Sequence, residues 1–173
     1  MLDDSEEEEY STPGSGAANK TTTHYAAPQV DLFIMDPDSF VYNPALLDMP
    51  DTESATALCD VFIYRFLTLQ PILHGPSIRQ YLTGQGDYLD LPHDDPAVRA
   101  LAFAIFYAAI TTLQPSECLE QFNVDRQTAL TRYRFATELS LAQADLHRTT
   151  ELTTLQAMMI YLVSLFSPLS FEH

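Results

Sequence analysis

Residues 95–113, DPAVRALAFAIFYAAITTL, form the most apolar stretch of the chain. Asp95 is a favourable helix cap, and Pro96 suits the first helical position because the N–H that it lacks has no partner there. Beyond Arg99 the stretch has no polar face, so a helix formed by it must be covered on every side. Its purely apolar run, Ala100 to Ile110, is shorter than the ~20 residues that cross a bilayer. The stretch therefore predicts the central helix of a soluble domain, packed among other helices.

Five further segments have apolar residues at the spacing of three or four that is typical of helices. No segment alternates apolar and polar residues convincingly over the length of a strand. We therefore predict an all-α, irregular multi-helix domain of about five to six helices. Besides the central helix, these are a helix capped by Thr52 and ended by Pro71, a short one at 77–82, a short one opened by Pro115, one from about 125 to 146 capped by Asn123 or Asp125, and one from about 150 to 166 capped by Thr150.

The expected helix 125–146 is amphipathic. Arg134 and Glu138 lie four residues apart, and we predict an ion pair between them on the solvent side, worth a few tenths of a kcal/mol. The arginines of this helix suggest either contact with DNA or RNA or, as the favoured interpretation, salt bridges to Glu138, Asp145 and neighbouring helices. The predicted core positions are Leu130, Tyr133, Ala136, Leu139, Ala142 and Leu146, and the arginines are Arg126, Arg132, Arg134 and Arg148.

Charge separates an N-terminal tail from the rest of the chain. The formal net charge is −16, and residues 1–53 hold half of the 24 acidic residues but only one base, Lys20. We predict an acidic, largely disordered tail and linker at 1–50 and a helical domain at 51–173. Residues 30–50 resemble acidic activation segments, although a linker that packs back on the domain is favoured. With only 8 basic residues, the chain is not expected to bind nucleic acid directly.

No residue pattern predicts a catalytic, cofactor-binding or metal-binding site. Cys59 and Cys118 have no second cysteine at ligand spacing and are predicted to be buried thiols in a reducing compartment. The position of Cys118 in a helix-opening segment could lower the pKa of its thiol. His74 is interpreted as a capping or packing residue, and the group His93-Asp94-Asp95 as a polar loop with a helix cap.

Four segments together resemble the fungal-specific transcription factor domain, which is the middle homology region of fungal binuclear zinc cluster (Zn2Cys6) transcription factors. The resemblance covers about residues 58–165, and its four motifs occur in the family's order and spacing. The segments are LCDVFIYRFLTLQPILHGPSI at 58–78, AVRALAFAIFYAAITTLQPSECLEQF at 97–122, DRQTALTRYRFATELSLAQADLHRT at 125–149 and ELTTLQAMMIYLVSL at 151–165.

The resemblance implies a nuclear, non-enzymatic regulatory protein, although no targeting signal is visible and a cytoplasmic location is the alternative. This chain departs from the family because it lacks six N-terminal zinc-binding cysteines and the later part of the helical region. We therefore expect a truncated domain that associates with a full-length zinc cluster regulator or other transcription proteins, as a homodimer or heterodimer. In the family, later helices cover the last helix of this chain; its predicted interaction surface is Met158, Met159, Tyr161, Leu162 and Phe166.

Two other functional interpretations remain open at this stage. The domain could have become a small helical enzyme or ligand-binding protein, with a pocket beside the central helix and Tyr107, Tyr133 and Tyr161 as polar groups in it. The chain could also be a truncated gene product with no independent role. A cavity lined by clustered titratable residues favours the first of these, whereas a filled core favours the regulatory interpretation.

Overall fold

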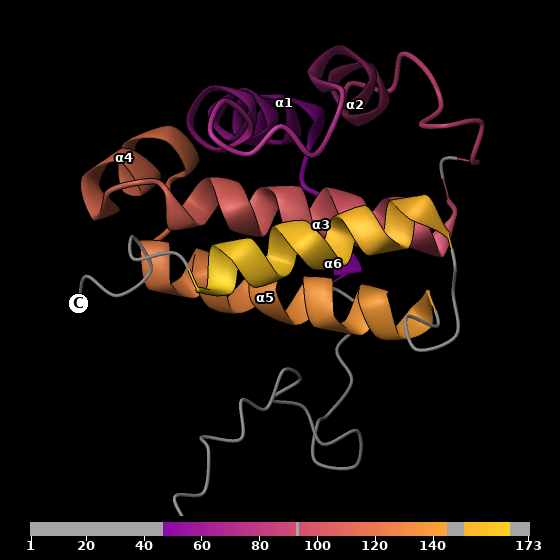
Figure 1. The fold of residues 1–173 in the computed structure, drawn as a ribbon. Coiled ribbons are helices and arrows are strands. Elements are labelled where there is room, and N and C mark those ends of the chain that lie inside the picture. The colour runs from indigo at the N-terminus through magenta and orange to yellow at the C-terminus, as the bar shows by residue number, and fades with distance from the viewer. Residues whose placement is uncertain (1–46, 93, 145–150, 167–173) are drawn as a thin grey trace, which may run out of the picture. The chain divides into compact units, whose positions relative to one another are not determined.

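The computed structural model describes residues 47–92, 94–144 and 151–166. These residues form six α-helices and one π-helical segment and contain no strand, which confirms the predicted all-α class (Figure 1). The predicted acidic tail lies outside the described residues, except for its last four. The elements are α1 (Thr52–Val61), η2 (Phe62–Leu67), α2 (Gly75–Leu82), α3 (Pro96–Thr111), α4 (Pro115–Phe122), α5 (Arg126–Gln143) and α6 (Leu152–Leu165).

Helix α3 is the centre of the fold, as its sequence predicts. Every residue of α3 except Pro96 and Arg99 is buried. In Figure 1, α1 and α2 lie on one side of α3, whereas α5 and α6 run alongside it on the other. Its closest partners are α5 and α6, followed by α1 and η2. A helix with no polar face is thus covered by neighbours all round.

The first helix differs from the prediction at both ends. Its cap is Asp51 and not Thr52, because the Asp51 carboxylate accepts hydrogen bonds from the Ser54 N–H at 3.0 Å and the Ser54 hydroxyl at 2.8 Å. At Phe62 the regular helix changes into the π-helical η2. The rings of Phe62 and Phe66 stack there at 5.1 Å between centroids, and both side chains are buried.

The predicted starts of the middle helices are largely confirmed. The Asp95 carboxylate accepts from the Ala97 N–H at 2.8 Å at the start of α3. Pro115 opens α4 after Gln114, and the Glu117 carboxylate accepts a hydrogen bond from the Gln114 N–H at 2.8 Å, which completes a capping box. Of the two caps considered for α5, Asp125 is the one observed, whereas Asn123 ends α4 in a left-handed conformation.

The buried face of α5 is only partly the predicted one. Tyr133 and Ala136 are buried, but Leu130 and Leu139 are half-buried, Ala142 is exposed, and Leu146 lies outside the described residues. The buried positions include the polar residues Thr137, Glu138 and Ser140. The prediction of one narrow row of core positions was wrong because α5 packs against both α3 and α6. Two neighbouring helices bury a wider arc of its surface than one does.

The end of the predicted linker packs on the helices. Leu47 is buried, and its carbonyl oxygen accepts a hydrogen bond from Arg99 of α3 at 3.1 Å. The next carbonyl, that of Asp48, accepts from Arg132 of α5 at 3.2 Å. Two arginines on different helices therefore hold the backbone of residues 47–48.

Candidate interaction surface

The outward face of α6 carries exposed apolar side chains along its whole length. The exposed fractions are 58% for Leu152, 42% for Leu155, 53% for Met159 and 56% for Phe166, which ends the helix. Val163, between the last two, is half-buried. We call these five residues the α6 stripe.

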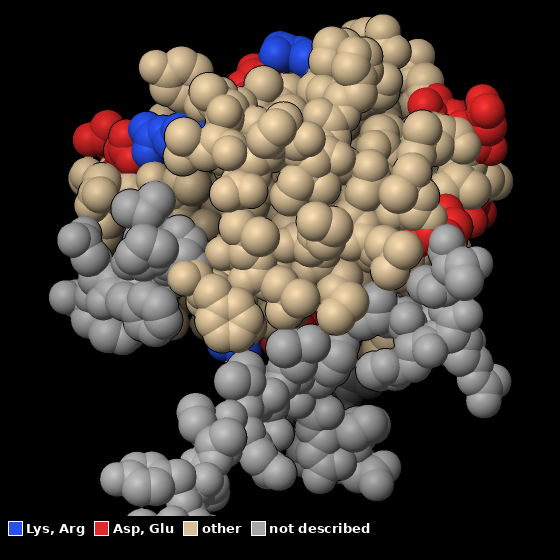
Figure 2. Space-filling model, viewed as in Figure 1, with Lys and Arg blue, Asp and Glu red and all other residues tan. Residues whose placement is uncertain are grey.

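The α6 stripe lies on a surface without charge. Among the described helices, α6 alone contains no Asp, Glu, Lys or Arg. Figure 2 shows the face of the molecule over α6 as uncharged, with the acidic and basic side chains at its margin. Exposed apolar residues gathered on one uncharged face are typical of protein–protein contact sites.

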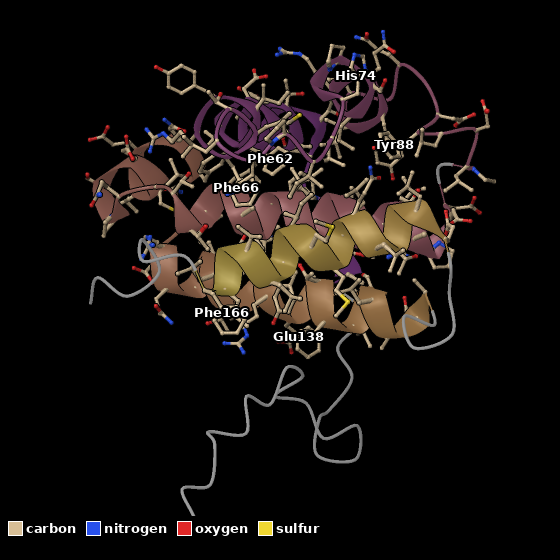
Figure 3. The ribbon with its side chains drawn as sticks, viewed as in Figure 1. Phe62, Phe66, His74, Tyr88, Glu138 and Phe166 are labelled. Atoms are coloured by element: carbon tan, nitrogen blue, oxygen red, sulfur yellow. The ribbon has the colours of Figure 1, made fainter. Side chains whose placement is uncertain are left out.

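The inward face of α6 is anchored to α5 by a buried polar cluster. The hydroxyl of Tyr161 donates a hydrogen bond to Oε1 of Glu138, and Nε of Arg134 donates to the same oxygen at 3.0 Å. Burial raises the pKa of Tyr161, and its hydrogen bond with the Glu138 carboxylate raises it further. The hydroxyl therefore stays protonated and remains a donor. Figure 3 labels Glu138 on α5 and Phe166 at the end of α6.

The predicted Arg134–Glu138 ion pair is confirmed, but its predicted place on the solvent side of α5 was wrong. Glu138 is 4% exposed, and Arg134 is partly buried. The i,i+4 spacing reveals the pair but not its environment. The pair is buried because α6 crosses this part of α5 and brings Tyr161 to Glu138.

A second polar contact ties α6 to the loops that precede α3. The side-chain oxygen of Gln156 accepts from the Tyr88 hydroxyl at 3.2 Å, and its nitrogen donates to the Ile72 carbonyl at 3.3 Å. Gln156 therefore joins two loops to one helix. With the Glu138 cluster, it holds α6 in the orientation that directs the α6 stripe outward.

The sequence-predicted interaction surface needs one correction. Met159 and Phe166 are exposed and Met158 and Leu162 are half-buried, but Tyr161 is 1% exposed and faces the core. Its ring lies 5.6 Å from that of Tyr107 on α3. The prediction missed Leu152, Leu155 and Val163. Counting back from Met159 in steps of four and three could have found the first two.

The tyrosines considered as polar groups of a pocket are packed residues. Tyr107, Tyr133 and Tyr161 are all buried. The centroid of the Tyr133 ring lies 5.6 Å from that of Phe106 on α3. The guanidinium carbon of Arg132 lies 5.4 Å from the centroid of the Tyr133 ring. These contacts are those of core side chains.

The remaining candidate residues have structural partners or unreactive surroundings. His74 precedes α2, and its Nδ1 lies 2.8 Å from the Ser77 hydroxyl. Burial raises the pKa of Cys59 to about 12 and also raises the pKa of Cys118, so the helix start does not activate Cys118. Both thiols are buried and unpaired with each other. His93, Asp145 and Arg148 lie outside the described residues.

The described arginines all donate hydrogen bonds to acceptors of the chain itself. Arg65 binds Glu117 through two nitrogens, at 2.9 and 2.7 Å, and Arg79 pairs with Asp60. Arg126 donates to the Thr111 carbonyl at 3.1 Å. Arg99, Arg132 and Arg134 have the partners given above. The basic side predicted for α5 is thus occupied by internal contacts.

Among the described residues, no group of three or more His, Cys, Asp or Glu side chains is arranged to hold a metal ion. None of the helices that the structure describes combines the length and hydrophobicity needed to span a membrane.

Comparison with known proteins relates part of the chain to fungal transcription factors. The chain is 33% identical to the C6 finger domain transcription factor adaR of Aspergillus niger over 110 residues. These residues make up 64% of this chain and 14% of that protein. The chain is 36% identical over 117 residues to the aurofusarin cluster transcription factor aurR2 of Gibberella zeae, which is 67% of this chain and 17% of that protein. The chain is 33% identical to the transcription factor vrtR2 of Penicillium aethiopicum over 124 residues, and these residues make up 70% of this chain and 15% of that protein.

These relatives agree with the resemblance seen in the sequence. The chain spans only 14 to 17% of the length of the curated relatives it matches. No family model matches the chain. No solved structure matches it either. The similarity therefore relates about two thirds of the chain to fungal C6 transcription factors.

Proposed function

We propose that this chain is a helical, nuclear transcription-regulatory module that acts by binding another regulatory protein through the α6 stripe. The partner that we propose is a full-length zinc cluster regulator of the kind to which the chain is similar. The module performs no catalysis and contributes no DNA contact of its own. The observation that carries the proposal is the row of exposed apolar residues on α6, the one described helix without a charged residue.

The rest of the described domain supports a binding role. Its central helix is buried, and the tyrosines beside that helix pack against neighbouring side chains. A filled core favours a scaffold over a ligand-binding protein. The relatives compared are all transcription factors by name.

Charge supports the absence of direct DNA contact. Phosphate binding requires Lys and Arg side chains that are free to face the backbone of the nucleic acid. The described arginines are engaged within the domain, and the chain as a whole carries a net charge of −16. An approach to duplex DNA is therefore opposed by repulsion.

Binding to a purified full-length regulator tests the proposal. The C6 finger domain transcription factor adaR is the probe, immobilised and titrated with this chain. We expect saturable binding, and we expect Met159→Glu to weaken it by about tenfold or more because a charge is placed in an apolar contact. Leu119→Glu is the matched control: Leu119 is 56% exposed but lies on α4.

Two results contradict the proposal. One is the absence of binding at micromolar concentrations of folded chain. The other is equal binding by Met159→Glu and wild type, since the α6 stripe is then not the contact. A parallel titration of the chain alone with duplex DNA at physiological salt is expected to show no complex. A tight complex contradicts the proposal that the module makes no DNA contact of its own.

A further inference from the structure

The spacing of the residues in the α6 stripe is symmetric about its middle residue, Met159. Leu152 precedes Met159 by seven residues and Phe166 follows it by seven. Leu155 precedes it by four, and Val163 follows it by four. At ~100° per residue, the five side chains lie within about 40° of one line along the helix. Two copies of this stripe laid side by side in opposite directions match apolar residues at every step.

A two-fold axis between identical subunits requires this kind of pattern. In such an interface one patch meets itself, so each residue on one side of the axis must suit its counterpart on the other. An axis beside Met159 places Met159 against Met159 of the second copy. It also places Leu155 against the second copy's Val163, and Leu152 against the second copy's Phe166.

Charge restricts where two copies of this chain can meet. Each copy carries a net charge of −16, so faces with acidic residues repel one another. Helix α6 has no Asp, Glu, Lys or Arg between Leu152 and Leu165, and Figure 2 shows the charged side chains at the margin of this face. In an antiparallel pair the two helix dipoles also point in opposite directions, which is the favourable arrangement.

We propose that two copies of the chain pair through α6, with antiparallel helices related by a two-fold axis beside Met159. This inference rests on the proposed function in one respect, which is that the α6 stripe is a protein-binding surface. The protein that binds it here is a second copy of the chain. A single pair of helices buries less than the ~800 Å² per partner of a standard interface. We therefore expect a dimer with a dissociation constant in the micromolar range.

The oligomeric state of the purified chain is the first test. Sedimentation equilibrium over a range of concentrations is expected to show a shift from the 19.4 kDa monomer to a species of twice that mass. Met159→Glu is expected to remain monomeric, because it brings two like charges together at the axis. Leu119→Glu on α4 is expected to dimerise as wild type does. A monomer at every concentration overturns the proposal.

Cysteine cross-linking tests the direction of the helices. Met159→Cys is expected to form a disulfide-linked dimer on mild oxidation, since the axis brings the two copies of residue 159 within bonding range. Leu152→Cys alone is not expected to cross-link, but it is expected to do so when mixed with Phe166→Cys. Efficient cross-linking of Leu152→Cys alone indicates parallel helices and overturns the proposal. Both native thiols are buried and are therefore not expected to form cross-links in this assay.

The two proposals fail in different ways. If the chain stays monomeric but binds the full-length regulator in a manner sensitive to Met159→Glu, the α6 pairing is wrong and the proposed function stands. If the chain dimerises through α6 but no regulator binds it, the pairing stands and the proposed function is wrong.

Discussion

The hydroxyl of Tyr161 on α6 donates a hydrogen bond to the carboxylate of Glu138 on α5, in a place where both side chains are almost fully buried. Arg134 completes the cluster from the preceding turn of α5. Three polar groups from two helices thus satisfy one another where α6 contacts α5. Since this contact holds the inward face of α6, it also determines which side chains α6 presents outward.

Replacing Glu138 is expected to destabilise the domain. Glu138→Ala leaves the Tyr161 hydroxyl and the Arg134 guanidinium without their acceptor, and loss of one member of a buried charged cluster costs about 3–5 kcal/mol. Glu138→Gln keeps an acceptor and should cost less, about 1–2 kcal/mol. Urea unfolding followed by circular dichroism measures both. Glu120→Ala, at an exposed position of α4, is the control, and an equal effect of Glu120→Ala and Glu138→Ala contradicts the prediction.

Acid is expected to weaken the contact between η2 and α4. The guanidinium of Arg65, followed by the Gln114 N–H, lowers the pKa of Glu117 from 4.5 to about 2. Because the folded-state pKa lies below the unfolded value, this stabilisation is complete above pH 4.5 and is lost as the pH falls toward about 2. Glu117→Gln should therefore lose less stability than wild type across that range.

Melting temperature as a function of pH tests the role of Glu117. Glu120→Gln, on the same helix, is the control and should follow the wild-type curve. If Glu117→Gln also follows it through the acid range, the Arg65–Glu117 pair does not contribute to acid sensitivity.

Both cysteines are expected to resist thiol reagents in the folded protein. Burial excludes the reagent and raises the pKa of Cys59 to about 12, so little reactive thiolate forms near neutral pH. Colorimetric thiol titration should show slow labelling that becomes fast in denaturant. Leu119→Cys serves as the positive control, because it places a thiol on an exposed position of α4 and should react at once. Rapid labelling of the native chain contradicts the burial of these residues.

The two faces of α6 are expected to respond differently to changes in volume. Ala157 is fully buried, and Ala157→Leu overfills its site at a cost of about 1–3 kcal/mol. Leu152→Ala, on the outward face, should change the free energy of unfolding by about 0.5 kcal/mol or less. Thermal unfolding of the Met159→Glu variant, measured beside these two, should match that of Leu152→Ala. A large loss from Leu152→Ala means that Leu152 is buried and that α6 is rotated about its axis.

The capping residues show how much of the fold local chemistry predicts. Asp95 with Pro96, and Pro115 with the turn before it, mark helix starts that the structure confirms. The same reasoning misplaced the first cap by one residue, since Thr52 and Asp51 are both acceptable caps and only the contact with Ser54 distinguishes them. It also placed the cap of the last helix at Thr150, whereas Glu151 is the residue that precedes α6. The π-helical turn at Phe62 had no local signal, because its residues also suit a regular helix.

The all-α class, the buried position of α3, the starts of α3 and α4 and the resemblance to fungal transcription regulators follow from the sequence alone. These features depend on composition and on spacings within one segment, which are visible without knowing what packs against what. The burial of Glu138 and the orientation of Tyr161 into the core were decided by tertiary structure. Whether a polar residue is buried depends on which helix crosses it, and that is set by contacts between residues far apart in the chain.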